Sequence, residues 1–214
     1  MRLTDYRALL VDCDGVLIDS DSGVWAALQG LFEGSGTVPA RVTVLALYHE
    51  ALAELYPRFD ELGFTGLLCF AHRKLAEGFN VRVSWEESLS FARSVQGWPL
   101  FEDAPGALLY LRKFYRLVVL CDRDAQDREG LCERLGLASE ELLAPSAVNA
   151  WLDEQQIPQD QALSISVRVP ADGLPQGSCL LRRGRKQVSQ QCPAEVCINS
   201  LADLVFQHQL SLRC

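Results

Sequence analysis

The sequence lacks the features that mark membrane, zinc-binding and nucleic-acid-binding proteins. No apolar run approaches the roughly 18 residues that a helix needs to cross a bilayer. The eight cysteines form no Cys-x-x-Cys pair, and the three histidines do not lie near them at the spacing of zinc ligands. A formal net charge of -8 argues against nucleic acid as a partner. We therefore expect neither a membrane nor a nucleic acid to be the partner of this chain.

The sequence also shows no signal-peptide pattern and contains few lysines. The first residues, Met1 to Arg7, do not follow the pattern of a signal peptide, which predicts a cytoplasmic protein with reduced thiols. Lysine occurs only three times, and the basic run Arg182–Lys186 is expected to be a solvated loop. The length of 214 residues and an apolar content of 49% predict one globular domain, or one domain with an insertion.

What the sequence does contain is a buried strand that ends in two acids. Residues Ala8–Val11 are apolar without a break, which predicts a strand covered on both faces of a parallel sheet. Asp12 and Asp14 follow at a spacing that turns both side chains the same way in an extended chain. Ligands of such sheets bind at this end of the strands, and neighbouring carboxylates repel unless a cation or a shared proton relieves them. We interpret the pair as a functional site rather than as a surface turn.

The run from Asp12 to Asp19, Asp-Cys-Asp-Gly-Val-Leu-Ile-Asp, resembles the first motif of the haloacid dehalogenase (HAD) superfamily. For a phosphatase of that family, the resemblance implies that Asp12 attacks phosphorus and that Asp14 protonates the leaving oxygen. It also implies a Mg2+ ion held by the Asp12 carboxylate and the backbone carbonyl of Asp14. A carboxylate nucleophile needs its charge masked in this way when it meets an anion.

The apolar pattern changes from strand to helix after Asp19. Spacings of three and four residues predict four helices, at Val24–Phe32, Arg41–Leu55, Leu62–Leu75 and Trp85–Val95. These helices would form a small bundle at residues 20–98, inserted into an α/β domain at residues 1–19 and 99–214. In the HAD family a helical cap grows at this position, so the resemblance implies a Rossmann-like core with an inserted helical cap.

The second part of the α/β domain alternates between helix and strand. Pro105 suits the first turn of a helix, Arg116–Asp122 reads as a second buried strand, and Gly136 ends the helix that follows. Together with Trp98–Phe101, this order resembles the 2-haloacid dehalogenase branch of the family and its phosphatase relatives. Further elements are expected as a helix at Ala147–Gln155, strands at Ala162–Arg168 and Ser178–Leu181, and a last helix capped by Ser200.

The second motif of the family is altered in this chain. It normally places a Ser or Thr hydroxyl against the phosphoryl oxygens, and here Cys121, Asp122 and Arg123 are the expected substrate-binding residues. A thiol is a weaker hydrogen-bond donor than a hydroxyl, so Cys121 keeps the shape of the contact but weakens it. Cys13 and Cys121 would then flank one cleft, either as a redox-sensitive pair or as apolar filling.

The third and fourth motifs have lost their key side chains. The third is a lysine, and the best register puts Ala144 at that position, with Arg123 or Arg168 as candidate replacement cations. The fourth supplies acids to the Mg2+ shell, and Val167 stands where the first acid is expected. Asp172 is then the nearest candidate metal ligand, although Pro-Ala-Asp-Gly is also an ordinary turn sequence.

Three functions remain open on these residues. The first is hydrolysis of a phosphate ester of a small metabolite through an aspartyl-phosphate on Asp12. The second is a catalytically silent HAD-fold protein that binds a ligand or partner, because two of the four motifs have lost their key side chain. The third is 2-haloacid dehalogenation, which needs no metal. Asp14 disfavours dehalogenation, as does the absence of an arginine from the start of the helical segment Leu47–Glu50.

Overall fold

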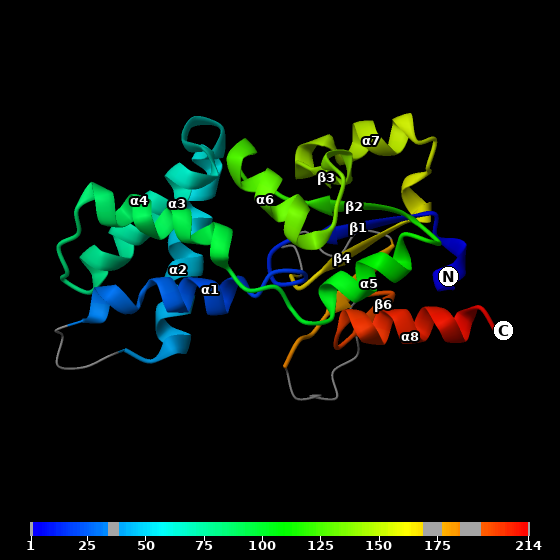
Figure 1. Cartoon of the computed structure of the whole chain (residues 1–214), viewed down its shortest axis with the longest axis horizontal. Coiled ribbons are helices and arrows are strands. Elements are labelled where there is room, and N and C mark those ends of the chain that lie inside the picture. The colour runs from blue at the N-terminus through cyan, green and yellow to red at the C-terminus, as the bar shows by residue number, and fades with distance from the viewer. Residues whose placement is uncertain (1, 34–38, 169–176, 185–193, 214) are drawn as a thin grey trace. The chain divides into compact units, whose positions relative to one another are not determined.

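The apolar run near the N-terminus forms an interior strand of a six-stranded sheet in a computed structural model, which describes residues 2–33, 39–168, 177–184 and 194–213. The strand order is β3-β2-β1-β4-β5-β6, and every neighbouring pair is parallel (Figure 1). The predicted α/β class with a Rossmann-like parallel sheet is therefore confirmed. The strands are β1 Ala8–Asp12, β2 Arg116–Leu120, β3 Leu142–Leu143, β4 Ala162–Ser166, β5 Ser178–Leu181 and β6 Val196–Ile198.

The chain divides into two compact units. The first comprises Met1–Ile18, Leu100–Asp122 and Cys132–Cys214, and it contains the whole sheet. The second comprises Asp19–Pro99 together with Arg123–Leu131. The segment that follows β2 therefore belongs with the helical residues of the second unit, although it is far from them in sequence. That the second unit serves as a cap for an active site stays a prediction.

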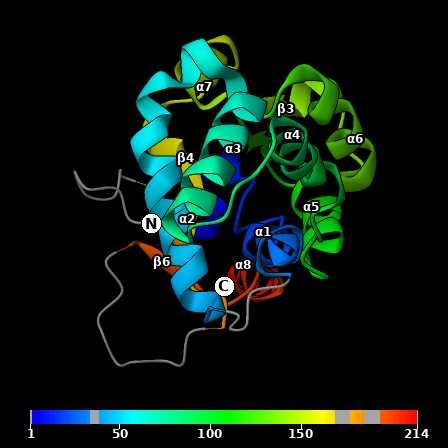
Figure 2. The same ribbon diagram turned by 90° about the vertical axis from the view of Figure 1, so that its left-hand side faces the viewer.

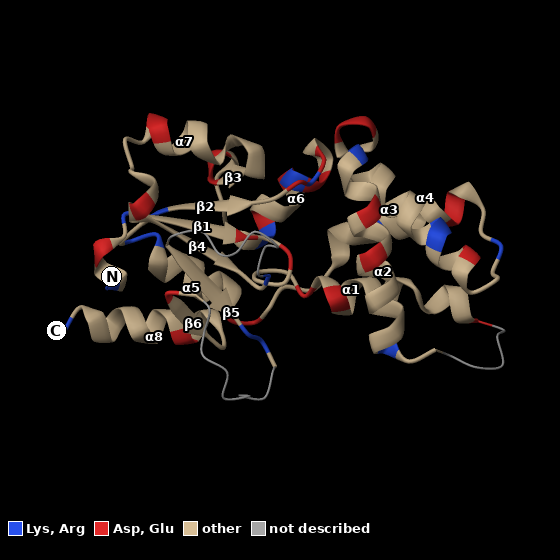
Figure 3. Ribbon diagram, turned by 180° about the vertical axis from the view of Figure 1, so that it is seen from behind, with Lys and Arg blue, Asp and Glu red and all other residues tan. Residues whose placement is uncertain are grey.

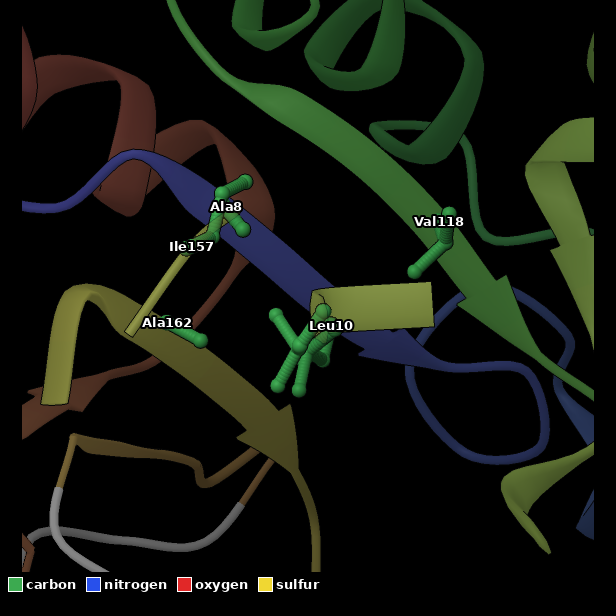
Figure 4. Packing of buried hydrophobic residues seen from close by; sticks show 6 residues of the cluster. Ala8, Leu10, Val118, Ile157 and Ala162 are labelled. Atoms are coloured by element: carbon green, nitrogen blue, oxygen red, sulfur yellow. The ribbon is translucent and has the colours of Figure 1, made fainter. Parts of the chain in front are cut away.

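Strand β1 is buried on both faces, and its successive side chains alternate between these faces. On one face, Leu10 lies in register with Val118 of β2 and packs in a cluster that includes Leu152 of helix α7 (Val148–Glu154). The buried residues of this cluster, most of them labelled in Figure 4, are Ala8, Leu10, Val118, Leu152, Ile157 and Ala162. The same alternation turns Asp12 toward this face, at the end of the strand.

Helices lie on both faces of the sheet of the first unit. Helix α7 lies on one face, whereas α5 (Ala104–Leu111) and α8 (Leu201–Ser211) lie side by side on the other (Figure 1). Ser200 caps α8 as predicted, since its hydroxyl oxygen accepts from the Asp203 N–H at 3.0 Å. The Asp203 carboxylate accepts a hydrogen bond from the N–H of Asn199 at 3.0 Å, one residue earlier than in a standard capping box.

The second unit is built from helices, as the three- and four-residue spacings predict. These are α1 (Ser20–Ala27), α2 (Arg41–Leu55), α3 (Phe59–Gly78) and α4 (Trp85–Arg93), and α3 packs against both α2 and α4 (Figure 2). Helix α6 (Ala125–Leu135) begins in this unit and ends in the first. Short 3-10 turns lie at Leu3–Asp5, Gln29–Phe32, Tyr56–Arg58, Ser94–Gly97, Ser139–Glu141, Pro145–Ala147 and Gln159–Gln161. Within the described ranges, no helix combines the length and the apolar character needed to cross a membrane.

The cysteines agree only in part with the expectation of reduced thiols. Five of them are buried thiols, namely Cys13, Cys69, Cys121, Cys132 and Cys179. Cys197 is disulfide-bonded instead, so the prediction is wrong at that position. Cys197 is half-buried on β6, the last strand of the sheet, whereas the five thiols are enclosed by core side chains.

Helix α3 is broken at Gly63 and capped from a distant part of the chain. Gly63 has a φ of 63° and a ψ of 176°, which are not helical values. After the break, the N–H groups of Phe64 and Thr65 donate to the carboxylate of Asp124 at 3.1 and 2.9 Å, and the Thr65 hydroxyl donates to it as well. Asp124 therefore acts as a helix cap and ties the chain after β2 into the second unit.

Two of the three histidines are buried, and burial has the largest effect on their titration. His72 of α3 is 4% exposed and hydrogen-bonds Ser88 through Nδ1 at 3.2 Å. His208 of α8 is 2% exposed, and its Nδ1 lies 3.1 Å from the hydroxyl of Tyr110. Burial lowers the pKa of both imidazoles, because the charged form would lose its hydration.

We expect the free energy of unfolding to fall as the pH drops below about 6.5, the ordinary pKa of histidine. The unfolded chain then binds protons that the folded chain does not, at a cost of up to about 1.4 kcal/mol per pH unit for each buried histidine. Urea unfolding from neutral to mildly acidic pH measures this slope. H72Q and H208Q should each flatten it relative to the wild type, because each removes one buried imidazole. Slopes in both variants equal to that of the wild type would contradict the prediction.

Removing the Asp124 cap is expected to destabilise the protein. D124A should lower the free energy of unfolding by about 1–2 kcal/mol, because two N–H groups at the restart of α3 lose their acceptor. D124N keeps one acceptor oxygen and should lose less. The matched control is D153A, which replaces an exposed carboxylate of α7. Denaturant unfolding compares the variants, and equal midpoints for D124A and D153A would refute the capping role.

Candidate functional site

Asp12 is half-buried at the carboxyl end of β1, where several charges act on it. Loss of hydration raises the pKa of its carboxyl above the usual range. A hydrogen bond donated by the Ser166 hydroxyl and the positive charge of Arg168 oppose this rise, whereas the negative charges of Asp14 and Asp122 add to it. The ends of β1, β2 and β4 therefore bring together acidic, hydroxyl and cationic groups around one carboxylate.

The strand register explains how Ser166 reaches Asp12. Val11 of β1 pairs with Ile165 of β4, so the next residue of each strand, Asp12 and Ser166, lie beside one another. On the other side, Asp12 pairs with Leu120 of β2. Ser166 was not anticipated from the sequence. The alternation Leu-Ser-Ile-Ser in β4 carries the signal, but only the register identifies which serine meets the acid.

The loop after β1 turns back at Gly15. This residue has a φ of 80°, and its N–H donates to the carbonyl oxygen of Ile18 at 2.8 Å. A Cβ at this position would lie 2.7 Å from Cγ2 of Val167, so a side chain here would clash with the end of β4. Asp14, just before the turn, is half-buried, and its charge acts on Asp12. The predicted acid pair therefore belongs to one electrostatic environment.

Arg183, just after β5, holds the same loop. Its Nη2 donates to the carbonyl oxygen of Val16 at 2.8 Å, and both terminal nitrogens donate to the Asp103 carboxylate, at 2.8 and 3.2 Å. Asp103 also accepts from the N–H of Leu201, the first residue of α8, at 2.7 Å. The expectation of a solvated loop is wrong at Arg183, whose side chain is 18% exposed, because these contacts hold it against the sheet unit.

Cys121 and Asp122 follow β2 directly. The N–H of Cys121 donates to the carbonyl oxygen of Leu143 at 2.8 Å, which continues the pairing of β2 with β3. Cys121 is 4% exposed and Cys13 is 3% exposed, so both thiols are enclosed. A redox role for this pair stays a prediction. Asp122 is half-buried and acts on Asp12 through its charge.

Arg123 is 5% exposed, and its guanidinium contacts aromatic rings of the second unit. Its central carbon lies 4.2 Å from the centre of the Phe64 ring and 5.0 Å from that of Trp98. Such cation–π contacts stabilise a buried guanidinium. Of the two arginines considered as replacement cations, Arg168 is the one whose charge lowers the pKa of Asp12. A role for Arg123 in substrate binding stays a prediction.

The third-motif position, Ala144, directly follows β3 and brings no charge. Of the three lysines, Lys74 pairs with Glu54 in the second unit, Lys113 is exposed, and Lys186 lies outside the described residues. Asp172, the candidate metal ligand, also lies outside them. Within the described ranges, no three Asp, Glu, His or Cys side chains come together as a metal site.

The donor groups around Asp12 fit a metal held by few protein ligands. Mg2+ binds proteins through one or two carboxylates, with water or substrate oxygens in the remaining positions. Asp12 offers a carboxylate, Asp14 offers its backbone carbonyl, and the mutual repulsion of Asp12, Asp14 and Asp122 is what a cation would relieve. A fuller carboxylate shell is not formed by the part of the chain that the structure describes.

Comparison with known proteins relates this chain to others through its fold. No protein-family model matches the sequence, and no curated protein matches it either. The L-2-haloacid dehalogenase from Xanthobacter autotrophicus, with chloropropionic acid covalently bound, is similar with a TM-score of 0.71 at 12% identity, over 95% of this chain and 98% of that one. A second L-2-haloacid dehalogenase has a TM-score of 0.71 at 19% identity, over 95% and 99% of the two chains.

A further structural relative was solved with a metal. The HAD-hydrolase YfnB from Bacillus subtilis, bound to magnesium, has a TM-score of 0.67 at 17% identity, over 96% of this chain and 98% of that one. The similarity spans nearly the full length of each protein, so it includes the helical segment as well as the sheet. The expected resemblance is confirmed at the level of architecture: this chain has the fold of the haloacid dehalogenase-like proteins.

Proposed function

We propose that the chain is a HAD-type hydrolase that uses Asp12 as its nucleophile on a phosphate ester of a small metabolite. The observation that supports this most strongly is the setting of Asp12 at the carboxyl end of an interior parallel strand. There the Ser166 hydroxyl donates to the carboxylate, and the charges of Asp14 and Arg168 act on it. A half-buried carboxylate with a shifted pKa and a hydrogen-bond partner is typical of a reactive group.

The proposed reaction has two displacements at phosphorus. A carboxylate oxygen of Asp12 forms a bond to phosphorus while the bond to the leaving oxygen breaks, and protonated Asp14 gives its proton to that oxygen. Asp14 then takes a proton from water, whose oxygen attacks the same phosphorus. The bond between Asp12 and phosphorus breaks, which releases inorganic phosphate and restores both side chains. Cys121 and Asp122 are proposed to border the substrate.

Mg2+ is proposed as the cofactor, held by the Asp12 carboxylate and the backbone carbonyl of Asp14. When bound, it supplies positive charge that masks these groups from the incoming anion. Asp172 is kept as a proposed additional ligand from the sequence. We also propose a cytoplasmic location.

A second candidate is a catalytically silent protein that binds a ligand at the same site. Two observations favour it. Burial raises the pKa of Asp12, which disfavours the charged form that acts as a nucleophile. The third-motif position is Ala144, which provides no cation to steady the reaction. Activity measurements separate the two candidates directly.

The purified protein with Mg2+ is expected to release inorganic phosphate from members of a panel of small phosphate esters. D12N should lower kcat by about a thousandfold or more, because the nucleophile is lost. D14N should lower it by about a hundredfold or more through loss of the acid and base. D153N, which changes an exposed carboxylate, is the control and should match the wild type.

A parallel assay measures chloride released from 2-chloropropionate and is expected to detect none. No phosphate release from any ester, with wild type and D12N indistinguishable, would reject the phosphatase and favour the silent protein. If the wild type releases chloride and D12N does not, the phosphatase proposal is rejected in favour of dehalogenation.

The raised pKa of Asp12 predicts a conflict between activity and stability. Because the folded state favours the protonated acid, the contribution of Asp12 to stability is greatest below its ordinary pKa of about 4 and is lost as pH rises through the raised value. D12N should therefore have a higher melting temperature than the wild type at neutral pH, and this gain should vanish in acid. Circular dichroism melts across pH measure it, with D153N as the control. A D12N variant less stable than the wild type at neutral pH would contradict the prediction.

A further inference from the structure

Arg168 is fixed at the end of β4 through its backbone. Its N–H donates to the Ser166 hydroxyl oxygen at 3.1 Å, and that hydroxyl in turn donates to the Asp12 carboxylate. Ser166 thus accepts one hydrogen bond and gives another, which links the backbone of Arg168 to the proposed nucleophile. Val167, between them, packs against Gly15 of the loop after β1. Residues 166–168 are therefore held against the site by contacts on both sides.

The side chain of Arg168 is exposed, in contrast to the groups around it. Asp12, Asp14 and Ser166 are half-buried, so Arg168 is the group of this cluster that solvent reaches most freely. A guanidinium presents five N–H groups in a planar fork that matches the oxygens of phosphate or carboxylate. Arg168 therefore has the position and the chemistry to meet an anion that approaches Asp12 from solution.

The charges around Asp12 create a need for such a group. Asp14 and Asp122 add negative charge, and Ala144 brings no cation to the neighbouring strand end. Acidic residues outnumber basic ones over the whole chain, 28 to 20, and both are spread along the ribbon (Figure 3). Long-range attraction by the protein as a whole would not bring an anion to this site. Positive charge at the site itself, from a cationic side chain in addition to the proposed Mg2+, would do so.

We propose that Arg168 binds the oxyanion group of the substrate and that Ser166, which accepts from the Arg168 N–H, holds the backbone of Arg168 at the strand end beside Asp12. This deepens the proposed function and rests on it for the identity of the anion, a phosphate. Arg168 is thus a substrate-binding residue contributed by β4, from a position that the sequence motifs do not assign to substrate binding.

Isothermal titration of the full chain with inorganic phosphate, in EDTA and again with Mg2+, tests the proposal. R168Q is expected to weaken phosphate binding by about tenfold or more in both conditions, because a charge-assisted pair is lost. R168K should weaken it less, since lysine keeps the charge but not the planar fork. R116Q removes the same charge from an exposed arginine at the opposite end of β2 and should bind as the wild type does. Melting temperatures of all variants check that they are folded.

The outcomes distinguish this proposal from the proposed function. Unchanged phosphate affinity in R168Q, or no binding of any anion by the wild type, would overturn the role of Arg168, and a D12N-sensitive phosphatase would still support the proposed function. A second titration with 2-hydroxypropionate, the product of a dehalogenase acting on 2-chloropropionate, separates the two anions. If only that carboxylate binds and R168Q abolishes binding, Arg168 is the anion-binding residue and the phosphatase assignment fails.

Discussion

The charge on Asp12 is the constraint on which the rest of the site depends. The strand that carries this residue is apolar and buried on both faces, so its end is a poor place for an anion. Two further acids act on it and make the charge more costly. Whatever the site does, the folded chain must offset this cost with groups brought from other strands. Ser166 and Arg168 are the ones that do so in the described residues.

The fold offsets the cost through contacts that are distant in sequence. The register between β1 and β4 sets Ser166 beside Asp12. Arg183, which follows β5 on the same side of β1 as β4, donates a hydrogen bond to the carbonyl oxygen of Val16 in the loop that carries Asp14. Its partner Asp103 accepts from the first N–H of α8, so a helix N-terminus and an ion pair are joined to that loop. The geometry of the acid pair is therefore a property of the whole sheet unit, and not of the motif alone.

These contacts also explain how much could be predicted from the sequence. Strands β1 and β2 and the helices could be predicted from long apolar runs and helical spacings, because these patterns reflect which side chains are buried. Helix α1 begins at Ser20 rather than Val24, since Asp19 caps it at the Ser22 N–H (3.1 Å) before the apolar spacing starts. Strands β3 and β6 have only two and three residues, too few to show a period. Ser166 and Arg183 were missed because only strand register and tertiary contacts give them a role.

The altered motifs change the number of charged side chains at the site. Relative to the pattern that the resemblance implies, alanine for lysine at position 144 removes one positive charge, and valine for an acid at position 167 removes one negative charge. The two changes cancel, and Arg168 then adds a positive charge beside Asp12. With fewer acidic ligands the site would hold Mg2+ less tightly, and the added guanidinium offers an anion a second positive group. These changes are easier to reconcile with a site that binds an anionic ligand than with a site that binds no ligand.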